Sequence, residues 1–323
     1  MMFPENRMRR RRTDERIRNM LTETRLHPDD LVLPLFFDET LDSVRYTESM
    51  PGVPAYPLKD AGKVAERISS SGIGAVMLFG IPRHKDSDGS GAYFEDGVVQ
   101  SAIRKIGSHS DLLVIADLCM CGYTDHGHCG ILSDGKTDND ATLLRYGKIA
   151  ESLAGAGAGM VAPSGMMDGQ VSAVREALDG SGHKDISIMA YSAKFCSSFY
   201  GPFRDIAHSA PSACGRESYQ MNPANGREAM SEIRLDIEEG ADIVMIKPAM
   251  PYLDVIRQAK DTFDISVAAY QVSGEYAMIR AAAANGWLDG NRTMMESLIS
   301  IKRAGADIVI SYFAEDAVKE LER

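Results

Sequence analysis

Three of the chain's five cysteines lie in one short segment, ADLCMCGYTDHGHCG, which directly follows the apolar run LLVIA. Thiols this close together form a disulfide, bind a metal ion, or are neighbours by chance. The N-terminus carries a basic cluster followed by charged residues instead of an apolar stretch, so we expect no secretory signal and a cytoplasmic location. Because thiols stay reduced in the cytoplasm, a disulfide is not expected.

The spacing of these cysteines suits a metal site with one open position. Cys119, Cys121 and Cys129 would supply three thiolates, whereas a closed structural zinc site takes four protein ligands. A fourth position left to water or substrate is typical of catalytic zinc. His126 and His128 would act as supporting groups or as an alternative ligand. The segment therefore predicts zinc on the three thiolates, catalytic in preference to structural.

Two lysines stand at the ends of apolar runs. Lys247 ends DIVMIKP, and Lys194 holds the equivalent position in MAYSAKF. Burial lowers the pKa of a lysine and leaves a nucleophilic amine. One such lysine could equally bind phosphate or pair with a carboxylate, but two on neighbouring strands favour imine formation with keto substrates.

A long segment after Lys194 adds cationic and polar groups. Arg204, Arg216, Tyr219 and Gln220 lie within 195–225, and arginines of this kind capture carboxylates through two parallel hydrogen bonds. An ordinary exposed loop is the alternative. Zinc, two imine-forming lysines and carboxylate clamps together predict a site that condenses two keto acids.

The elements that must position these groups follow a β/α rhythm. Eight short β-rich runs alternate with amphipathic stretches such as LKDAGKVAERISSSG, and several stretches end in glycine before the next run. Strands that are apolar on both faces indicate a parallel sheet covered by helices. The runs are LVLPLFF, GAVMLFG, LLVIADL, GMVAPSG, ISIMAYS, DIVMIKP, SVAAYQVS and DIVISYF.

Eight βα units are the number that closes a (β/α)8 TIM barrel. We expect this barrel over residues 31–323, preceded by an N-terminal arm over residues 1–30 that contacts other subunits. A doubly wound sheet is the weaker alternative, since no glycine-rich dinucleotide motif follows the first strand. Catalytic groups of such barrels lie at the carboxyl ends of the strands. Besides the cysteines and lysines, those ends carry Asp117, Ser164, Asp168, Ser273 and Tyr312.

Overall charge limits the classes of partner. The formal net charge is −11, which argues against general nucleic-acid binding, and no apolar run is long enough to span a bilayer. The exception is the arginine cluster of residues 7–12, which could grip phosphates. We favour its packing against an acidic neighbouring subunit.

Six motifs together resemble one enzyme family along nearly the whole chain. DLCMCGYTDHGHCG, APSGMMDG, YSAKFCSSFYGPFRDIA, EGADIVMIKPAMPYLD, YQVSGEYAM and GADIVISYF occur in the order found in the porphobilinogen synthase (5-aminolevulinate dehydratase) family. The resemblance implies condensation of two 5-aminolevulinate molecules to porphobilinogen, with loss of two waters, in tetrapyrrole (haem) biosynthesis. It implies that Lys247 holds the P-side substrate and Lys194 the A-side substrate as Schiff bases.

The resemblance also implies the remaining roles. Ser273 and Tyr312 would hold the P-side carboxylate, and zinc on the three cysteines would orient the A-side substrate. Arg204, Arg216 and Gln220 would hold the A-side carboxylate. Asp117, Ser164 and Asp168 would line the pocket.

A second metal and a quaternary structure come with the resemblance. Glu232 matches a position that in part of the family holds an allosteric magnesium ion between subunits, and the family is typically a homo-octamer with embracing arms. Gly165 and Gln170 depart from the family's usual Asp and Arg, which touches neither a lysine nor a zinc ligand.

Two rival functions use part of the same chemistry. A lysine-dependent aldolase needs one imine lysine and no thiolate cluster, and a zinc-storage or scaffolding protein needs the thiolates but neither lysine. Reductive trapping of lysine adducts separates these functions.

Overall fold

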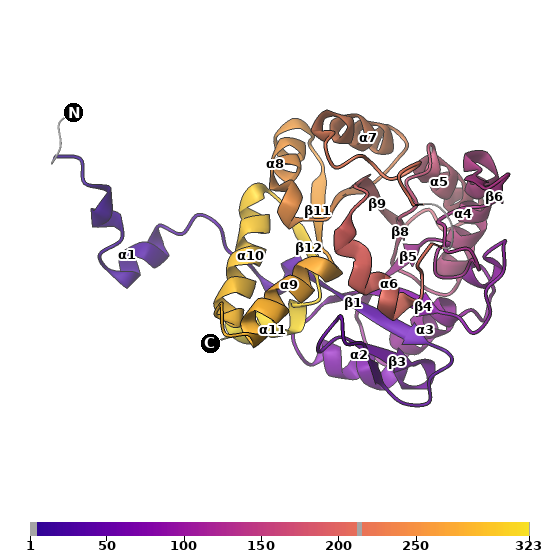
Figure 1. The fold of residues 1–323 in the computed structure, drawn as a ribbon, viewed down its shortest axis with the longest axis horizontal. Helices are drawn as coiled ribbons and strands as arrows, with labels where there is room; N and C mark the ends of the chain where they lie inside the picture. The colour runs from indigo at the N-terminus through magenta and orange to yellow at the C-terminus, as the bar shows by residue number, and fades with distance from the viewer. Residues whose placement is uncertain (1–4, 212–214, 323) are drawn as a thin grey trace.

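Eight parallel strands close into a barrel in the computed structural model, which describes residues 5–211 and 215–322. Closure is shown by the pairing of the first and last strands, in which Leu31 is opposite Val309 and Val32 opposite Ile310. Each strand coincides with one of the eight predicted runs, so the predicted (β/α)8 TIM barrel is confirmed (Figure 1). The strands are β1 (Leu31–Asp38), β4 (Ala75–Ile81), β5 (Leu113–Leu118), β8 (Met160–Pro163), β9 (Ser187–Lys194), β10 (Ile243–Lys247), β11 (Ser266–Gln271) and β12 (Ile308–Ser311).

An outer ring of helices covers the barrel (Figure 1). Helix α2 shows why they pack there: Val64, Ala65 and Ile68 recur at the spacing of one helical face and are buried, while Lys63 and Glu66 face solvent. The ring comprises α2 (Ala61–Ser69), α3 (Val98–Gly107), α4 (Asn139–Gly155), α5 (Gln170–Gly180), α7 (Gly226–Glu238), α8 (Leu253–Thr262), α10 (Gly290–Ala304) and α11 (Ala314–Leu321).

Glycines end two of these helices as the sequence predicts. Gly240 follows α7 with φ 103°, and Gly305 follows α10 with φ 123°. Side chains with a Cβ rarely adopt this backbone conformation, so glycine allows the chain to turn directly into β10 and β12.

Additional elements cover the mouth of the barrel. The long β9–α7 connection contains the 3-10 helix η5 (Ser198–Tyr200) and helix α6 (Gly201–Ala207), and both contact α9 (Ser273–Ala284), which begins just after β11. We call residues 195–225 the lid; its positions 212–214 lie outside the described residues. Short strands β2 (Arg45–Tyr46) and β3 (Pro54–Pro57) extend the sheet beside β1, and β6 (Leu132–Ser133) pairs with β7 (Lys136–Thr137).

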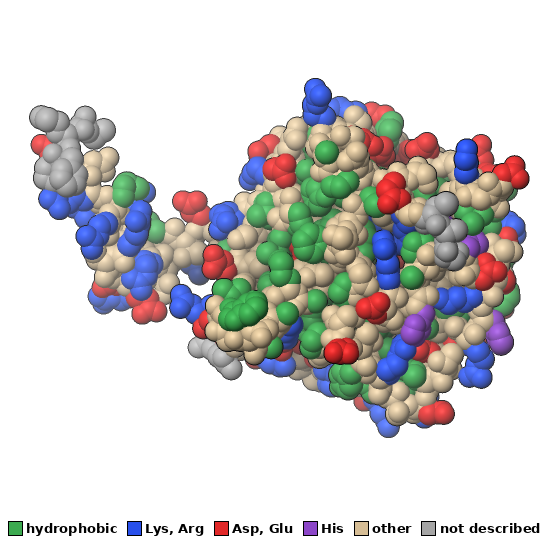
Figure 2. Space-filling view, in the orientation of Figure 1, with side chains coloured by type: hydrophobic (Ala, Val, Ile, Leu, Met, Phe, Trp, Pro, Cys, Tyr) green, Lys and Arg blue, Asp and Glu red, His purple; other side chains and the backbone are tan. Residues whose placement is uncertain are grey.

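The segment before β1 projects away from the barrel (Figure 1). It holds η1 (Met8–Arg11), α1 (Glu15–Met20) and η2 (Pro28–Asp30), none of which has a buried residue. Figure 2 shows basic side chains gathered on this segment. Its contacts with other subunits remain a prediction. Across the part of the chain that the structure describes, no helix is both long and apolar enough to cross a bilayer.

Candidate active site

Lys194 and Lys247 are the final residues of neighbouring strands, β9 and β10, and are paired directly across the two strands. Adjacent strands lie about 4.8 Å apart, and cross-strand partners point to the same side of a sheet. Both side chains are buried and line one pocket at the barrel mouth. The strand register therefore brings the two amines together on one face.

Aromatic rings surround the Lys247 amine. Its Nζ lies 4.0 Å from the ring centroid of Tyr270, 4.9 Å from that of Tyr191, and 5.5 Å from those of Tyr200 and Phe203. Burial, and then the Lys194 charge, lower the pKa of Lys247 to about 7 against the opposing effect of Asp117. A large neutral fraction at neutral pH makes this amine a competent nucleophile.

Lys194 lines the same pocket and also lies near the Tyr191 ring. Its Nζ donates a hydrogen bond to the Ser164 carbonyl and lies 5.5 Å from the Tyr191 ring centroid. Asp117, near the end of β5, lies beside the side chains of Ser164 and Tyr191, and burial raises the pKa of Asp117 against the charges of Lys247 and Lys194. A carboxyl group held between two amines can exchange protons with both.

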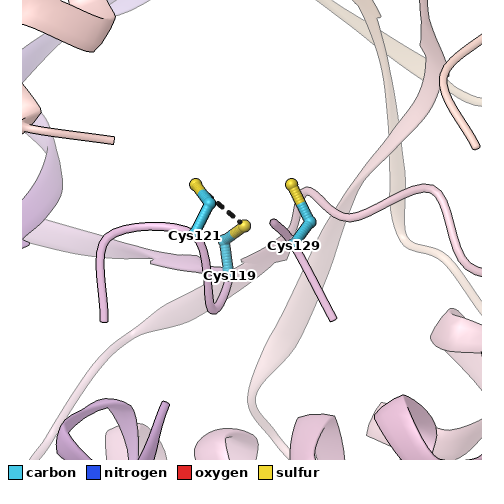
Figure 3. Close-up of side chains that lie close together, drawn as sticks. All are labelled: Cys119, Cys121 and Cys129. Carbon is cyan, nitrogen blue, oxygen red and sulfur yellow. Dashed lines mark hydrogen bonds between the residues drawn. The ribbon is translucent and has the colours of Figure 1, made fainter. Parts of the chain in front are cut away.

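The three predicted thiols lie together beside this pocket. The ligand atoms of Cys119, Cys121 and Cys129 lie within 4.8 Å of one another, and the Cys119 and Cys121 sulfurs are 3.4 Å apart. Figure 3 shows the three side chains converging from two segments of the chain. All three are buried, and Cys121 also lines the pocket that contains the lysines.

The donor set fits a zinc ion. Zinc–sulfur bonds of about 2.3 Å in a tetrahedron separate the sulfurs by about 3.8 Å, a separation that this cluster can accommodate. The neighbouring thiols of Cys119 and Cys121 hold the pKa of Cys129 well below its ordinary value, so the cluster favours a thiolate at Cys129. Among the described residues, this is the one group of three or more Cys, His, Asp or Glu side chains close enough to share an ion, and His126 and His128 lie outside it.

Ser273 and Tyr312 line the other side of the pocket. Ser273 is the first residue of α9, where its Oγ donates to the Phe199 carbonyl at 3.2 Å and accepts from the Phe203 amide at 3.0 Å. The Tyr312 hydroxyl is 3.0 Å from that of Tyr270. A helix N-terminus and two hydroxyl groups form a setting that favours a carboxylate.

Part of the lid reaches into the site. Arg216 is buried, lines the pocket, and donates through Nη2 to the carbonyls of Gly127 and Ser209. Arg204 and Gln220 belong to the same lid, and the Nε of each arginine and both polar atoms of the Gln220 amide are buried without a hydrogen-bond partner. Buried donors without partners are costly, so these atoms are suited to a ligand carboxylate.

Some predicted site residues lie elsewhere. Asp168, Gln220 and Glu232 line a second hollow outside the barrel mouth, and Asp168 is exposed there. Burial and then the Asp168 charge raise the pKa of Glu232. Arg204 lines neither hollow. Eight predicted site residues line the mouth pocket: Asp117, Cys121, Ser164, Lys194, Arg216, Lys247, Ser273 and Tyr312.

Sequence reasoning missed the tyrosines of the pocket. Tyr191 and Tyr270 lie inside apolar strand runs, where an aromatic residue is ordinarily a core side chain. Tyr191 lies three residues and Tyr270 one residue before the end of its strand, and this position was the available signal, because it places both rings just below the polar mouth.

Comparisons with known proteins give a single result. The sequence profile of a family described as "Delta-aminolevulinic acid dehydratase" matches residues 5–320. The chain belongs to this family. A delta-aminolevulinic acid dehydratase of Methanothermus sociabilis is 49% identical over 99% of this chain and 100% of its own length. That of Halalkalibacterium halodurans is 50% identical over 98% of this chain and 96% of its own length.

A solved structure agrees with the family assignment. The delta-aminolevulinic acid dehydratase (porphobilinogen synthase) of Toxoplasma gondii ME49, in complex with the reaction product porphobilinogen, superposes with a TM-score of 0.95. It is 41% identical, and the match covers 98% of this chain and 91% of that one. The chain is therefore a dehydratase-family enzyme on a TIM barrel, and the predicted family is confirmed.

Proposed function

We propose that this enzyme condenses two molecules of 5-aminolevulinate into porphobilinogen, with release of two waters, through imines on Lys247 and Lys194. The observation that carries the proposal is the placement of both amines, at paired strand positions, in one buried pocket beside three thiols. The aldolase alternative leaves the second lysine and the thiols without a role. The storage alternative leaves both lysines without one.

Lys247 begins the reaction in this proposal. Its neutral amine attacks the ketone carbon of the P-side substrate, and the carbinolamine loses water to give an imine. Lys194 forms the corresponding imine with the A-side substrate. Asp117, Ser164 and Tyr191 lie beside the two amines and move protons between the amines and the leaving oxygens.

The substrate carboxylates are held at opposite ends of the pocket. We assign the P-side carboxylate to Ser273 and Tyr312, because both line the pocket at the N-terminus of α9. We assign the A-side carboxylate to Arg216, which lines this pocket, together with Arg204 and Gln220 of the same lid; the unpartnered buried nitrogen atoms of these side chains support such a role. We place Asp168 beside the lid, where it lines the second hollow together with Gln220.

We assign zinc to Cys119, Cys121 and Cys129. When bound there, zinc supplies a Lewis acid beside the A-side substrate. The buried cysteines exclude bulk water from this end of the pocket, and the lid arginine Arg216 holds the loop between the second and third thiols by its bond to the Gly127 carbonyl.

We further propose an allosteric magnesium ion at Glu232, a homo-octamer that uses the N-terminal arms, and a cytoplasmic role in haem synthesis. Glu232 lines the second hollow together with Asp168 and with Glu228, which lies one turn earlier on α7. Magnesium retains several waters when it binds, so one glutamate with a second carboxylate or a neighbouring subunit provides enough protein ligands.

Borohydride trapping tests the condensation. Incubation with 5-aminolevulinate and reduction, followed by peptide mass analysis, should place adducts on Lys247 and Lys194. The Lys247→Ala variant should lose the adduct at position 247 and all turnover. Lys63, which is exposed on α2, provides the matched control: Lys63→Ala should show wild-type adducts and activity. An adduct on one lysine only would support an aldolase, and full zinc loading without any adduct would support storage.

A further inference from the structure

Helix α4 makes two side-chain hydrogen bonds to the backbone of the segment that carries the third thiol, Cys129. The Tyr146 hydroxyl donates a 2.8 Å hydrogen bond to the carbonyl of Cys129. One helical turn earlier, Thr142 Oγ1 accepts a 3.0 Å hydrogen bond from the amide of Ile131. Residues four apart lie on the same helix face, so α4 holds this segment at two points. Both Thr142 and Tyr146 are fully buried.

Cys129 needs such an anchor more than the other two thiols. Cys119 and Cys121 directly follow β5, whose pairing with β4 and β8 fixes their backbone. Cys129 lies eight residues after Cys121 in a loop, and the amide of Cys129 reaches the Tyr219 hydroxyl only at 3.4 Å. The hydrogen bond from the Tyr146 hydroxyl to the Cys129 carbonyl is therefore shorter than the bond from the Cys129 amide to Tyr219.

Gly165 supplies the space that Tyr146 occupies. A Cβ at position 165 would lie 1.7 Å from the Tyr146 hydroxyl oxygen and 2.7 Å from its Cζ. The φ of Gly165 is not positive, so backbone conformation gives no reason for glycine here. Steric exclusion by Tyr146 is the reason that remains.

The contact between Tyr146 and Gly165 also lies next to the backbone that binds Lys194. Gly165 follows Ser164, whose carbonyl accepts the hydrogen bond from Lys194 Nζ. The Tyr146 ring thus lies between the backbone of the third thiol and the end of β8 that supports Lys194.

We propose that Tyr146 is a positioning residue that fixes Cys129 for metal binding, and that Gly165 is its obligatory partner. The metal part of this inference rests on the proposed zinc site. The pairing of Tyr146 with Gly165 is steric and stands without a metal.

Tyr146→Phe tests the positioning role. Loss of a group that orients a metal ligand commonly weakens metal binding by about 10- to 100-fold, so the zinc dissociation constant, measured by chelator competition, should rise about tenfold. Tyr56→Phe is the matched control, because Tyr56 lies on β3, away from the thiols, and accepts a hydrogen bond from Arg67 of α2; its zinc affinity should equal that of the wild type. Wild-type affinity in Tyr146→Phe would overturn the positioning role, whereas a wild-type protein that binds no zinc would instead refute the zinc proposal.

A double-mutant cycle on zinc-free protein tests the pairing. Gly165→Ala should lower the melting temperature by several degrees or prevent folding in the wild-type background. In the Tyr146→Leu background, the same alanine should cause a much smaller further shift, because the atoms that exclude it are gone. Equal shifts in the two backgrounds would overturn the pairing, and a folded Tyr146→Leu/Gly165→Ala protein beside an unfolded single Gly165→Ala protein would support it.

Discussion

The position of Lys247 in the barrel determines whether its amine can act as a nucleophile. Lys247 owes its lowered pKa first to burial and then to the charge of Lys194, its partner across the strands. A lysine on the outer surface of the same barrel would keep its proton and could not attack a ketone at neutral pH. The aromatic rings around Nζ exclude water while still tolerating the charged amine.

The lowered pKa of Lys247 predicts a pH dependence. The amine loses its proton as the pH rises through about 7, far below the ordinary lysine value of 10.5, so kcat/KM should increase with pH and level off above about 8. Below about pH 6 the ammonium predominates and adduct formation should fall about tenfold per pH unit. The rate of borohydride-trapped adduct at Lys247, measured from pH 5 to 10, checks this, and a rise centred near pH 10 would contradict it.

Zinc removal should inactivate the enzyme reversibly. Three buried thiols provide the proposed site, and their backbone is fixed by β5 and α4, so the empty site should persist and accept zinc again. Dialysis against a chelator should abolish porphobilinogen formation, and added zinc should restore it. Full activity in metal-free protein would refute the zinc role.

Strand ends and the helices that follow them act as coupled elements. Glu275, in the first turn of α9, is fully buried and accepts hydrogen bonds from the amides of Val272, Ala249 and Met250. It therefore ties the end of β10, where Lys247 lies, to the start of α9, where Ser273 lies. Burial raises the pKa of Glu275 to about 7 against these three amides.

Glu275→Gln should disturb this link. The amide nitrogen of glutamine cannot accept, so at least one of the three backbone donors loses its partner at a cost of about 1–3 kcal/mol in unfolding free energy. We expect that loss in urea unfolding, together with a fall in kcat. Glu66→Gln on the exposed face of α2 is the control and should change neither quantity. If Glu275→Gln matched that control, the carboxylate would not be the link between the end of β10 and the start of α9.

The elements themselves could be predicted from the sequence, because each depends on a local pattern. Apolar runs such as DIVMIKP are strands wherever both faces are covered, and glycines such as Gly240 end helices by their own conformational freedom. The common mouth pocket followed from parallel strand ends. The placement of Asp168 and Gln220 did not, because it depends on the paths of two loops. The contact of Tyr146 with Gly165 likewise depends on how α4 packs against β8.

At the scale of the whole molecule, the barrel and the segment before it differ in charge. Residues 1–30 contain eight arginines against six acidic residues, so the rest of the chain is more acidic than the overall charge of −11 indicates. The described part of this segment projects from the barrel, with no buried residue in its helices (Figures 1 and 2). A basic extension and an acidic body are complementary surfaces for two copies of one chain.

Removal of residues 1–12 should therefore reduce the size of the assembly. The deletion removes the arginine cluster of η1 but leaves every described strand intact, so the protein should fold while sedimenting as species smaller than the proposed octamer. A variant with Arg9, Arg10, Arg11 and Arg12 replaced by lysine keeps the charge and should retain the larger assembly at low salt. Sedimentation velocity with and without magnesium measures both effects, and magnesium should shift the full chain, but not the deletion variant, towards the octamer. If the deletion variant still sedimented as an octamer, the barrels would associate without these arginines. Attraction between the basic segment and an acidic barrel would then not be what holds the assembly together.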